Sequence, residues 1–315
     1  MLTQQPIILH HFDQSPFSEK IRVIFGFKQL AWQSVRISRI MPRPDLMPLT
    51  GGYRRTPIMQ IGADIYCDTQ VIARELEARF PTPTLLPAGN TAVPMALGMW
   101  TDRSFFQNTV NLVFGTLGDK VPREFIEDRE RLRGAKFDVE AMRAALPQMR
   151  DQFRAHAGWI EAQLGDGRPW LLGEFSLADV NAYMNVWYTR SNLSDADQAL
   201  AGLDQILSRC PRILAWEKRI QTIGHGHRTE LSAEEALNIA AQASPQTSIM
   251  ADPEDPNGRQ PGDQVSVAPD DYGKVEVSGK IVALSAQHIA IKRDVDRVGE
   301  VVVHFPRAGF AVTRG

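Results

Sequence analysis

Apolar residues near the start of the chain change periodicity, from a continuous run to helical spacing and back. The run at 7–12 predicts a buried strand. Ile21, Ile24 and Phe25 then recur on one face of a predicted helix, and a second strand is expected at 32–40. Because strand and helix signals alternate within forty residues, this part of the chain is expected to form an α/β unit.

The same alternation continues to about residue 84. A Pro-rich turn precedes 56–67, whose two short apolar runs predict a hairpin around Gly62. Asp68 is a suitable N-cap for a helix that Pro81 ends. The order β-α-β-α-β-β-α predicts a first domain at 1–84.

Residues 85–243 have almost entirely helical periodicity and are expected to form an all-α domain. The charge run at 123–138 is typical of a solvent-exposed helix face. Ser176 and Asp179 have the spacing of a capping box, which would start a helix and carry no chemistry.

The pattern changes again after residue 243. The stretch 244–262 is rich in proline and poor in large apolar residues, which indicates a linker. Residues 263–315 are expected to form a small β-rich, barrel-like module with five strands: 274–279, 280–284, 288–293, 299–305 and 309–312. These strands carry more apolar surface than so small a module buries alone. We therefore expect the tail to pack on the helical half of its own or a partner chain, supporting a dimer or narrowing the active site.

Composition excludes several classes of function. The chain has 315 residues, 43% of them hydrophobic, and a formal net charge of −2, so neither nucleic acid nor an anionic membrane is an expected partner. Cys67 and Cys210 form no spaced framework, which favours the cytoplasm. The sequence HH at 10–11 and HGH at 225–227 lacks a third ligand at suitable spacing, so no metal is expected.

Four local motifs occur in an order that resembles cytosolic glutathione transferases, in particular bacterial serine-type enzymes with a tau- or omega-like N-terminal motif. They are SPFSEKIR at 15–22, RRTPI at 54–58, IYCDTQVIARELE at 65–77 and RPWLLGEFSLADV at 168–180. The resemblance covers about residues 5–243. It implies a thioredoxin-like N-terminal domain, a helical C-terminal domain, glutathione as co-substrate and a homodimer.

The chemistry of glutathione gives Ser15 a role. A free thiol with a pKa near 8.5 is only about 3% ionised at pH 7, and lowering that pKa by about two units takes about 2.7 kcal/mol. A hydroxyl donor at a helix N-terminus can supply this stabilisation, so Ser15 is the candidate catalytic residue, with Ser18 as the fallback. An ordinary N-cap remains the alternative for Ser15.

The resemblance also implies the remaining binding residues. A cis proline at Pro57 would expose the main chain of Thr56 to the cysteinyl backbone of glutathione, and an ordinary turn is the alternative. Arg54 and Arg55 are candidates for the glycyl carboxylate, unless they are simply solvated.

At the next helix start, Thr69 would hold the γ-glutamyl carboxylate and Asp68 the amine. The wall of the electrophile site is expected among four aromatic residues: Trp100, Phe105, Phe106 and Trp187.

Three functions fit these motifs. The first is thiolate attack on a small electrophilic substrate by a glutathione transferase. The second is a glutathione-dependent thiol reductase, which Ser15 disfavours because that chemistry usually needs cysteine at this position. The third is a non-catalytic interaction protein that retains the fold and binds partners through its tail.

Overall fold

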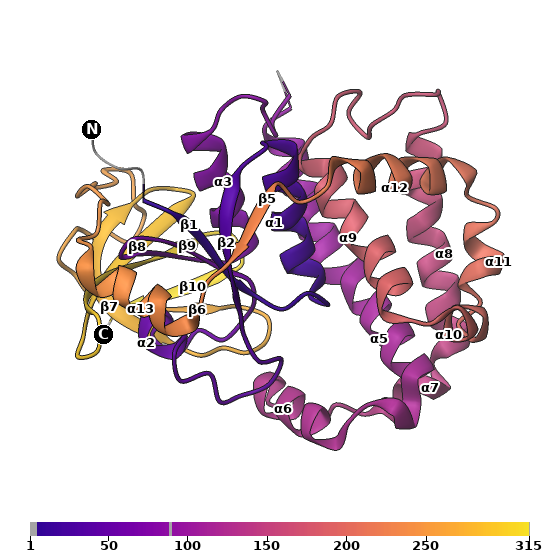
Figure 1. The fold of residues 1–315 in the computed structure, drawn as a ribbon, viewed down its shortest axis with the longest axis horizontal. Helices are drawn as coiled ribbons and strands as arrows, with labels where there is room; N and C mark the ends of the chain where they lie inside the picture. The colour runs from indigo at the N-terminus through magenta and orange to yellow at the C-terminus, as the bar shows by residue number, and fades with distance from the viewer. Residues whose placement is uncertain (1–4, 88–89, 315) are drawn as a thin grey trace.

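The computed structural model describes residues 5–87 and 90–314. Its strands gather at one end of the molecule and most of its helices at the other (Figure 1). The C-terminal strands lie beside the N-terminal ones, and helix α6 lies at the lower edge between the two halves (Figure 1). None of the described helices is both long enough and apolar enough to cross a membrane.

The N-terminal unit has the expected order of elements. These are β1 (Ile7–His11), α1 (Pro16–Phe27), β2 (Ala31–Arg36), the one-turn α2 (Met47–Thr50), β3 (Ile58–Ile61), β4 (Asp64–Cys67) and α3 (Thr69–Arg79). β1 pairs parallel with β2 and antiparallel with β3, and β3 forms the predicted hairpin with β4. The thioredoxin-like arrangement predicted from the sequence is confirmed.

Alternate residues of these strands enter two different cores, as the pleat of a strand requires. Leu9 and Met59 pack with the apolar face of α1 and with α3. Ile58 and Ile65 point to the opposite face of the sheet and pack with Leu237 and with residues of the C-terminal strands.

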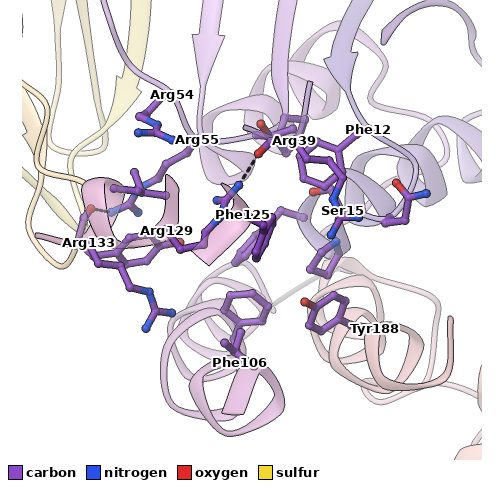
Figure 2. A pocket seen from close by; sticks show the side chains of 18 of the residues that line it. Phe12, Ser15, Arg39, Arg54, Arg55, Phe106, Phe125, Arg129, Arg133 and Tyr188 are labelled. Atoms are coloured by element: carbon purple, nitrogen blue, oxygen red, sulfur yellow. Dashed lines mark hydrogen bonds between the residues drawn. The ribbon is translucent and has the colours of Figure 1, made fainter. Parts of the chain in front are cut away.

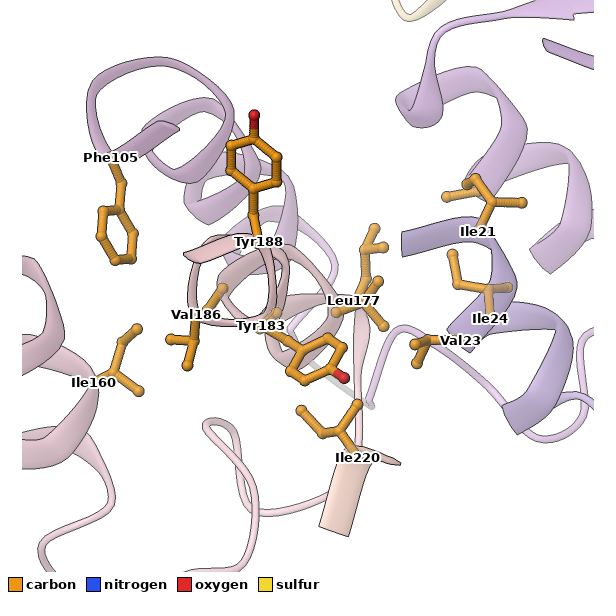
Figure 3. Close-up of a cluster of buried hydrophobic side chains, with 14 of the residues drawn as sticks. Ile21, Val23, Ile24, Phe105, Ile160, Leu177, Tyr183, Val186, Tyr188 and Ile220 are labelled. Atoms are coloured by element: carbon orange, nitrogen blue, oxygen red, sulfur yellow. The ribbon is translucent and has the colours of Figure 1, made fainter. Parts of the chain in front are cut away.

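The helical half contains the predicted helices and little else. They are α4 (Ala92–Trp100), the π-helical turn η1 (Thr101–Phe105), α5 (Phe106–Leu117), the 3₁₀ turn η2 (Gly118–Lys120), α6 (Arg123–Arg133), α7 (Val139–Ala144), α8 (Leu146–Gln163), α9 (Leu177–Asn192), α10 (Asp195–Leu200), α11 (Leu203–Leu207) and α12 (Pro211–Ile223). The predicted capping box of Ser176 and Asp179 begins α9. Apolar side chains of α1 and α9 share one core, so the two halves pack directly against each other there (Figure 3).

The chain then returns to the α/β unit earlier than the sequence suggested. Strand β5 (His227–Glu230) pairs parallel with β2, and α13 (Ala233–Gln242) packs on the sheet. Helical periodicity was expected through this region, and β5 was missed because four mostly exposed residues carry no apolar alternation.

The tail extends the same sheet. Its strands are β6 (Gln264–Pro269), β7 (Val277–Leu284), β8 (His288–Val295), β9 (Gly299–Pro306) and β10 (Phe310–Arg314). The whole sheet has ten strands in the order β10-β6-β7-β8-β9-β4-β3-β1-β2-β5, and β9 pairs parallel with β4. It is therefore an open sheet and not a separate barrel, although the extra strands themselves were predicted.

Two details of the tail differ from expectation. Residues 274–279 and 280–284 were expected as two strands, but the second half of the first and all of the second lie in the single strand β7, and β6 was not foreseen. The surplus apolar surface does dock, but mainly on the α/β unit and not on the helical half. The reason is that β4 has a free edge beside an apolar face that includes Ile65. Pairing of β9 with β4 fills the main-chain hydrogen bonds of that edge, and the tail strands cover the apolar face.

Candidate functional site

A pocket lies where the loops of the α/β unit face α5, α6 and the β6–β7 loop (Figure 2). The loops at 12–17, 53–57 and 68–69 form one side, which we call the near wall. Helix α6 and Tyr272 form the other side, the far wall. The near wall contains the following candidate residues: Ser15, Arg54, Arg55, Thr56, Pro57, Asp68 and Thr69.

Ser15 is the N-cap of α1 and lies on the pocket surface. Its Oγ accepts a hydrogen bond from the N–H of Ser18 at 3.2 Å. A hydroxyl that accepts through its oxygen can still donate its own proton, and no described residue accepts that proton. The N-cap and the donor roles are therefore compatible, and the α1 dipole acts on the same point.

Ser18 occupies a different environment. It is fully buried, it does not line the pocket, and its Oγ has no hydrogen-bond partner among the described residues. The geometry therefore favours Ser15 over its fallback.

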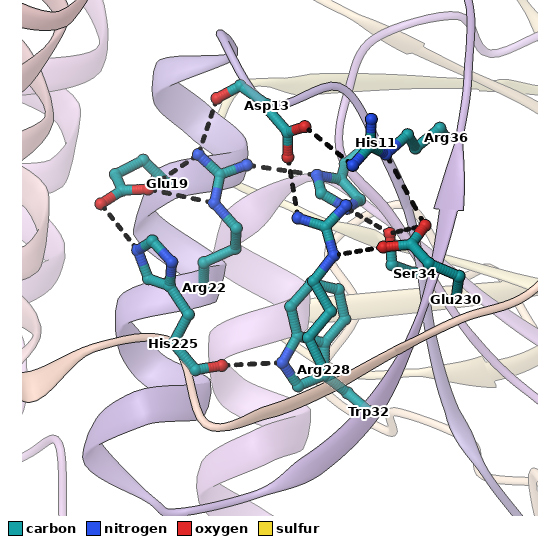
Figure 4. A network of polar contacts seen from close by, with 10 residues as sticks. All are labelled: His11, Asp13, Glu19, Arg22, Trp32, Ser34, Arg36, His225, Arg228 and Glu230. Carbon is teal, nitrogen blue, oxygen red and sulfur yellow. Dashed lines mark hydrogen bonds and ion pairs between the residues drawn. The ribbon is translucent and has the colours of Figure 1, made fainter.

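A polar network holds the loop that carries Ser15 (Figure 4). Arg22 donates to the main-chain oxygen of Asp13 at 2.9 Å and pairs with Glu19, while Arg228 of β5 binds the Asp13 carboxylate at 2.9 Å. Burial and the neighbouring arginines lower the pKa of His11 to about 3, so this histidine is neutral. The return of the chain through β5 thus fixes the position of the candidate donor.

Thr56-Pro57 has the predicted cis peptide bond. Arg43 is buried beneath this loop, where its guanidinium donates to the oxygen of Arg54 at 2.7 Å and to Thr56 Oγ1 at 3.1 Å. The main-chain N–H and C=O of Thr56 make no hydrogen bond with any other described residue. Thr56 can therefore pair with a peptide laid along this edge.

Asp68 and Thr69 begin α3 at the same side of the pocket. Asp68 caps the helix by accepting from the N–H of Gln70 at 2.9 Å. Burial raises the pKa of Asp68 to about 6, so the carboxylate is charged at neutral pH and is a partner for an amine. Thr69 is the first helical residue, where the free N–H groups of α3 favour a carboxylate.

Arg54 and Arg55 are not solvated, and each is already bound to an acidic residue. Arg54 pairs with the buried Asp128 of α6 at 2.6 Å, and the N–H of Met41 binds the same carboxylate at 3.0 Å. Arg55 pairs with Asp271 and donates to the oxygen of Tyr272 in the tail. Both arginines therefore join the near wall to the far wall.

The charge run at 123–138 was expected to face solvent, and in part this is wrong. Arg129 and Arg133 line the pocket, and Phe125 lies between them and Ser15 (Figure 2). Sequence alone missed these residues because both faces of α6 carry charge. Tyr272 of the tail was also missed, since no motif marks the loop that carries it.

Of the four aromatic residues expected around the electrophile, only Phe106 lines the pocket. Phe105 is fully buried in the core, Trp100 borders a separate groove with Trp159, and Trp187 packs partly buried against the core. Within residues 5–87 and 90–314, no cluster of His, Cys, Asp and Glu has a metal-binding arrangement.

Comparisons with known proteins agree with this fold. Residues 9–84 match the glutathione S-transferase N-terminal domain, and residues 143–219 match the C-terminal domain. FtsZ-localized protein A of Caulobacter vibrioides is 30% identical over 181 residues, which are 55% of this chain and 73% of that protein. The chain belongs to the glutathione S-transferase family.

Solved structures of the family separate the common fold from the tail. A GST-like protein from Pseudomonas syringae is 34% identical, has a TM-score of 0.77 and covers 98% of this chain and 100% of its own, so the C-terminal strands are shared. A glutathione S-transferase from Rhodospirillum rubrum F11 has 24% identity and a TM-score of 0.52 over 69% of this chain and 88% of its own. The similarity to the Rhodospirillum rubrum protein shows a shared fold only.

Proposed function

We propose that this protein is a glutathione transferase that activates glutathione as the thiolate for attack on a small electrophile. The position of Ser15 carries the proposal. Its hydroxyl lies at the N-terminus of α1, with the Thr56 edge and the start of α3 lining the same pocket. A tripeptide bound across these three points would place its sulfur beside Ser15.

The proposed reaction needs only groups that the near wall supplies. Ser15 donates its proton to the sulfur in a hydrogen bond and stabilises the thiolate, while the thiol proton leaves to solvent. The sulfur then forms a bond to the electrophilic carbon, and the leaving group departs with its electron pair. Because the hydroxyl interacts with charge on the sulfur more than with the peptide, it should affect turnover more than affinity.

The thiolate can be measured directly. We expect Ser15→Ala to lower turnover of 1-chloro-2,4-dinitrobenzene by about 100-fold, the scale expected for loss of one donor, and to raise the pKa of bound glutathione seen by ultraviolet thiolate absorbance. Glutathione affinity should stay within a few-fold. Ser18→Ala is the matched control, and loss of activity in that variant instead would transfer the role to Ser18.

A second candidate function is that of an interaction protein. The relative named FtsZ-localized protein A and the strand β10, which pairs on one side only with β6, favour it. Retention on immobilised glutathione followed by a turnover assay separates the two. An interaction protein with no role for the tripeptide would be neither retained nor active.

We also propose a cytoplasmic homodimer. Cys67 and Cys210 are both free and buried, as suits a reducing compartment. Trp159 is 59% exposed beside an apolar groove between α4 and α8, a surface suited to association. Light scattering should show that Trp159→Glu is monomeric, whereas Leu200→Glu, at another exposed apolar site, should leave a dimer. Dimers in both variants would argue against this interface.

A further inference from the structure

The pocket is rich in positive charge for a site whose second substrate is a small electrophile. Six arginines line the pocket, whereas Asp68 is its one acidic lining residue among those the structure describes. Asp128 and Asp271 pair with Arg54 and Arg55 from behind the surface. Asp128 also lies 3.4 Å from Arg129, so three of the six guanidinium groups have no carboxylate partner among the described residues, and the arginines exceed the three acidic residues by three charges.

These three groups can be identified. No carboxylate of a described residue lies within ion-pair distance of Arg39, Arg43 or Arg133. Arg43 is engaged by main-chain oxygens beneath the Thr56 loop, and burial with the neighbouring arginines lowers its pKa to about 10, still charged at neutral pH. Arg39 and Arg133 therefore carry the unpaired charge at the surface.

Aromatic rings alternate with these cations. The guanidinium of Arg39 lies 5.1 Å and that of Arg129 4.6 Å from the centre of Phe125. Arg55 lies 4.0 Å and Arg133 5.8 Å from the centre of Tyr272. Arg55 and Arg129 also bind protein partners, whereas the side chains of Arg39 and Arg133 donate to no described residue and stay available to a ligand. Phe125 and Tyr272 add apolar surface to the same pocket lining.

Contacts of the tail hold Tyr272, its residue in the far wall, in place. Gly273 has φ of +57°, and a Cβ there would come within 2.6 Å of Leu132 on α6. This close contact and the bonds from Arg55 fix Tyr272 against the helix. Burial raises the pKa of Tyr272, so its phenol stays neutral and keeps a proton to donate.

Glutathione alone does not balance this charge. Its thiolate form carries two carboxylates, a sulfur anion and one ammonium group, which leaves one of the three excess positive charges unmatched. A second anionic group in the pocket would match it, and a neutral electrophile would not.

We propose that the second substrate is a planar aromatic electrophile carrying an acidic group, bound between Phe125 and Tyr272 with its acid on Arg133 and Arg39. The tail is then a specificity element of the active site. This inference rests on the proposed transferase function. With a chlorinated aromatic substrate, the glutathione sulfur bonds to the ring carbon that bears chlorine, chloride leaves with the bonding electrons, and the thiol proton goes to solvent.

Binding is tested apart from turnover by calorimetry with 2-naphthoate and its neutral analogue 2-naphthamide, in the presence of S-methylglutathione. We expect the wild-type chain to prefer the carboxylate by at least about tenfold, and Arg133→Gln to lose most of that preference. Arg131→Gln, an exposed arginine on the same helix, is the matched control and should keep it. Equal affinity for the two probes, or an equal loss in both arginine variants, would overturn the proposal.

The second part of the test compares turnover of an acidic and a neutral chlorinated substrate. The rate with 4-chloro-3,5-dinitrobenzoate and that with 1-chloro-2,4-dinitrobenzene are each divided by their uncatalysed rates. We expect the acidic substrate to gain more in kcat/KM, and Tyr272→Ala to reduce that advantage more than Tyr272→Phe. Turnover without any preference for the acid would contradict the inference and leave the transferase function standing. Selective naphthoate binding without turnover of either substrate would support the anionic site and contradict the transferase function.

Discussion

The near and far walls of the pocket are built in opposite ways. Ser15, Thr56 and Thr69 lie at ends of neighbouring elements of one α/β unit, where short motifs decide the local geometry. Arg133 and Tyr272 come from a charged helix and from a loop more than a hundred residues further along the chain. Contacts between segments distant in the chain hold the far wall in position. Variants that break those contacts should therefore affect the far wall and the near wall differently.

Removal of residues 263–315 should have the largest effect. It uncovers the edge of β4 and the apolar face formed by Ile58, Ile65 and Leu237, each worth about 1.5–3 kcal/mol when buried. We expect a chain that aggregates or melts at least about 10 °C lower, with glutathione binding lost as well. A chain ending at 306, which lacks β10 but keeps β9, is the control in thermal melting and should lose far less. An unchanged melting temperature after removal of 263–315 would show that the tail is independent of the near wall.

The α/β unit and the tail differ in how far their structure follows from the sequence. The strands and helices of the α/β unit and the Asp68 cap follow from local pattern, whereas the cis Pro57 follows from the family resemblance, and the structure contains all of them. The docking of the tail does not follow, because pairing of β9 with β4 joins positions more than two hundred residues apart. Periodicity reports which face of a strand is apolar, not which neighbour covers it.

Arg54→Leu should have the next largest effect, because it detaches α6 from the near wall. The carboxylate of Asp128 would stay buried after losing its best partner, which costs about 3 kcal/mol, reduced to the extent that Arg129 at 3.4 Å takes over. Chemical denaturation should measure this loss. Arg123→Ala breaks an ion pair of α6 whose arginine side chain is 92% exposed, and it should hardly change stability. Equal effects of the two substitutions would mean that α6 is not anchored through Asp128.

Acid should lower the free energy of unfolding through two buried histidines of β1, the strand that leads to Ser15. Burial lowers the pKa of His10 to about 4, and His11 is lowered to about 3, whereas the unfolded chain binds these protons near pH 6.5. The stability these neutral histidines contribute is complete above pH 6.5 and is lost as the pH falls toward 4. The slope is at most about 1.4 kcal/mol per pH unit for each histidine.

The measurement is the free energy of unfolding at several pH values between 7 and 4. His10→Gln should flatten the dependence, because the buried titrating group is removed. His227→Gln, on the exposed strand β5, is the control for loss of a histidine. A dependence of the same slope in wild type and His10→Gln would assign the acid sensitivity to other groups.

The smallest effect is expected within the near wall itself. Thr69 lies at the first position of α3, far from Ser15 in sequence but on the same pocket surface. Thr69→Val removes a hydroxyl that we assign to the γ-glutamyl carboxylate, so KM for glutathione should rise by about five- to tenfold, as for one charge-assisted hydrogen bond. The saturated rate should hardly change, because this contact forms equally with bound substrate and with the transition state. Thr69→Ser is the control and should retain a low KM. A fall in kcat that matches the fall in kcat/KM would place Thr69 at the reacting sulfur, and the near wall would then hold two groups with the role we assign to Ser15 alone.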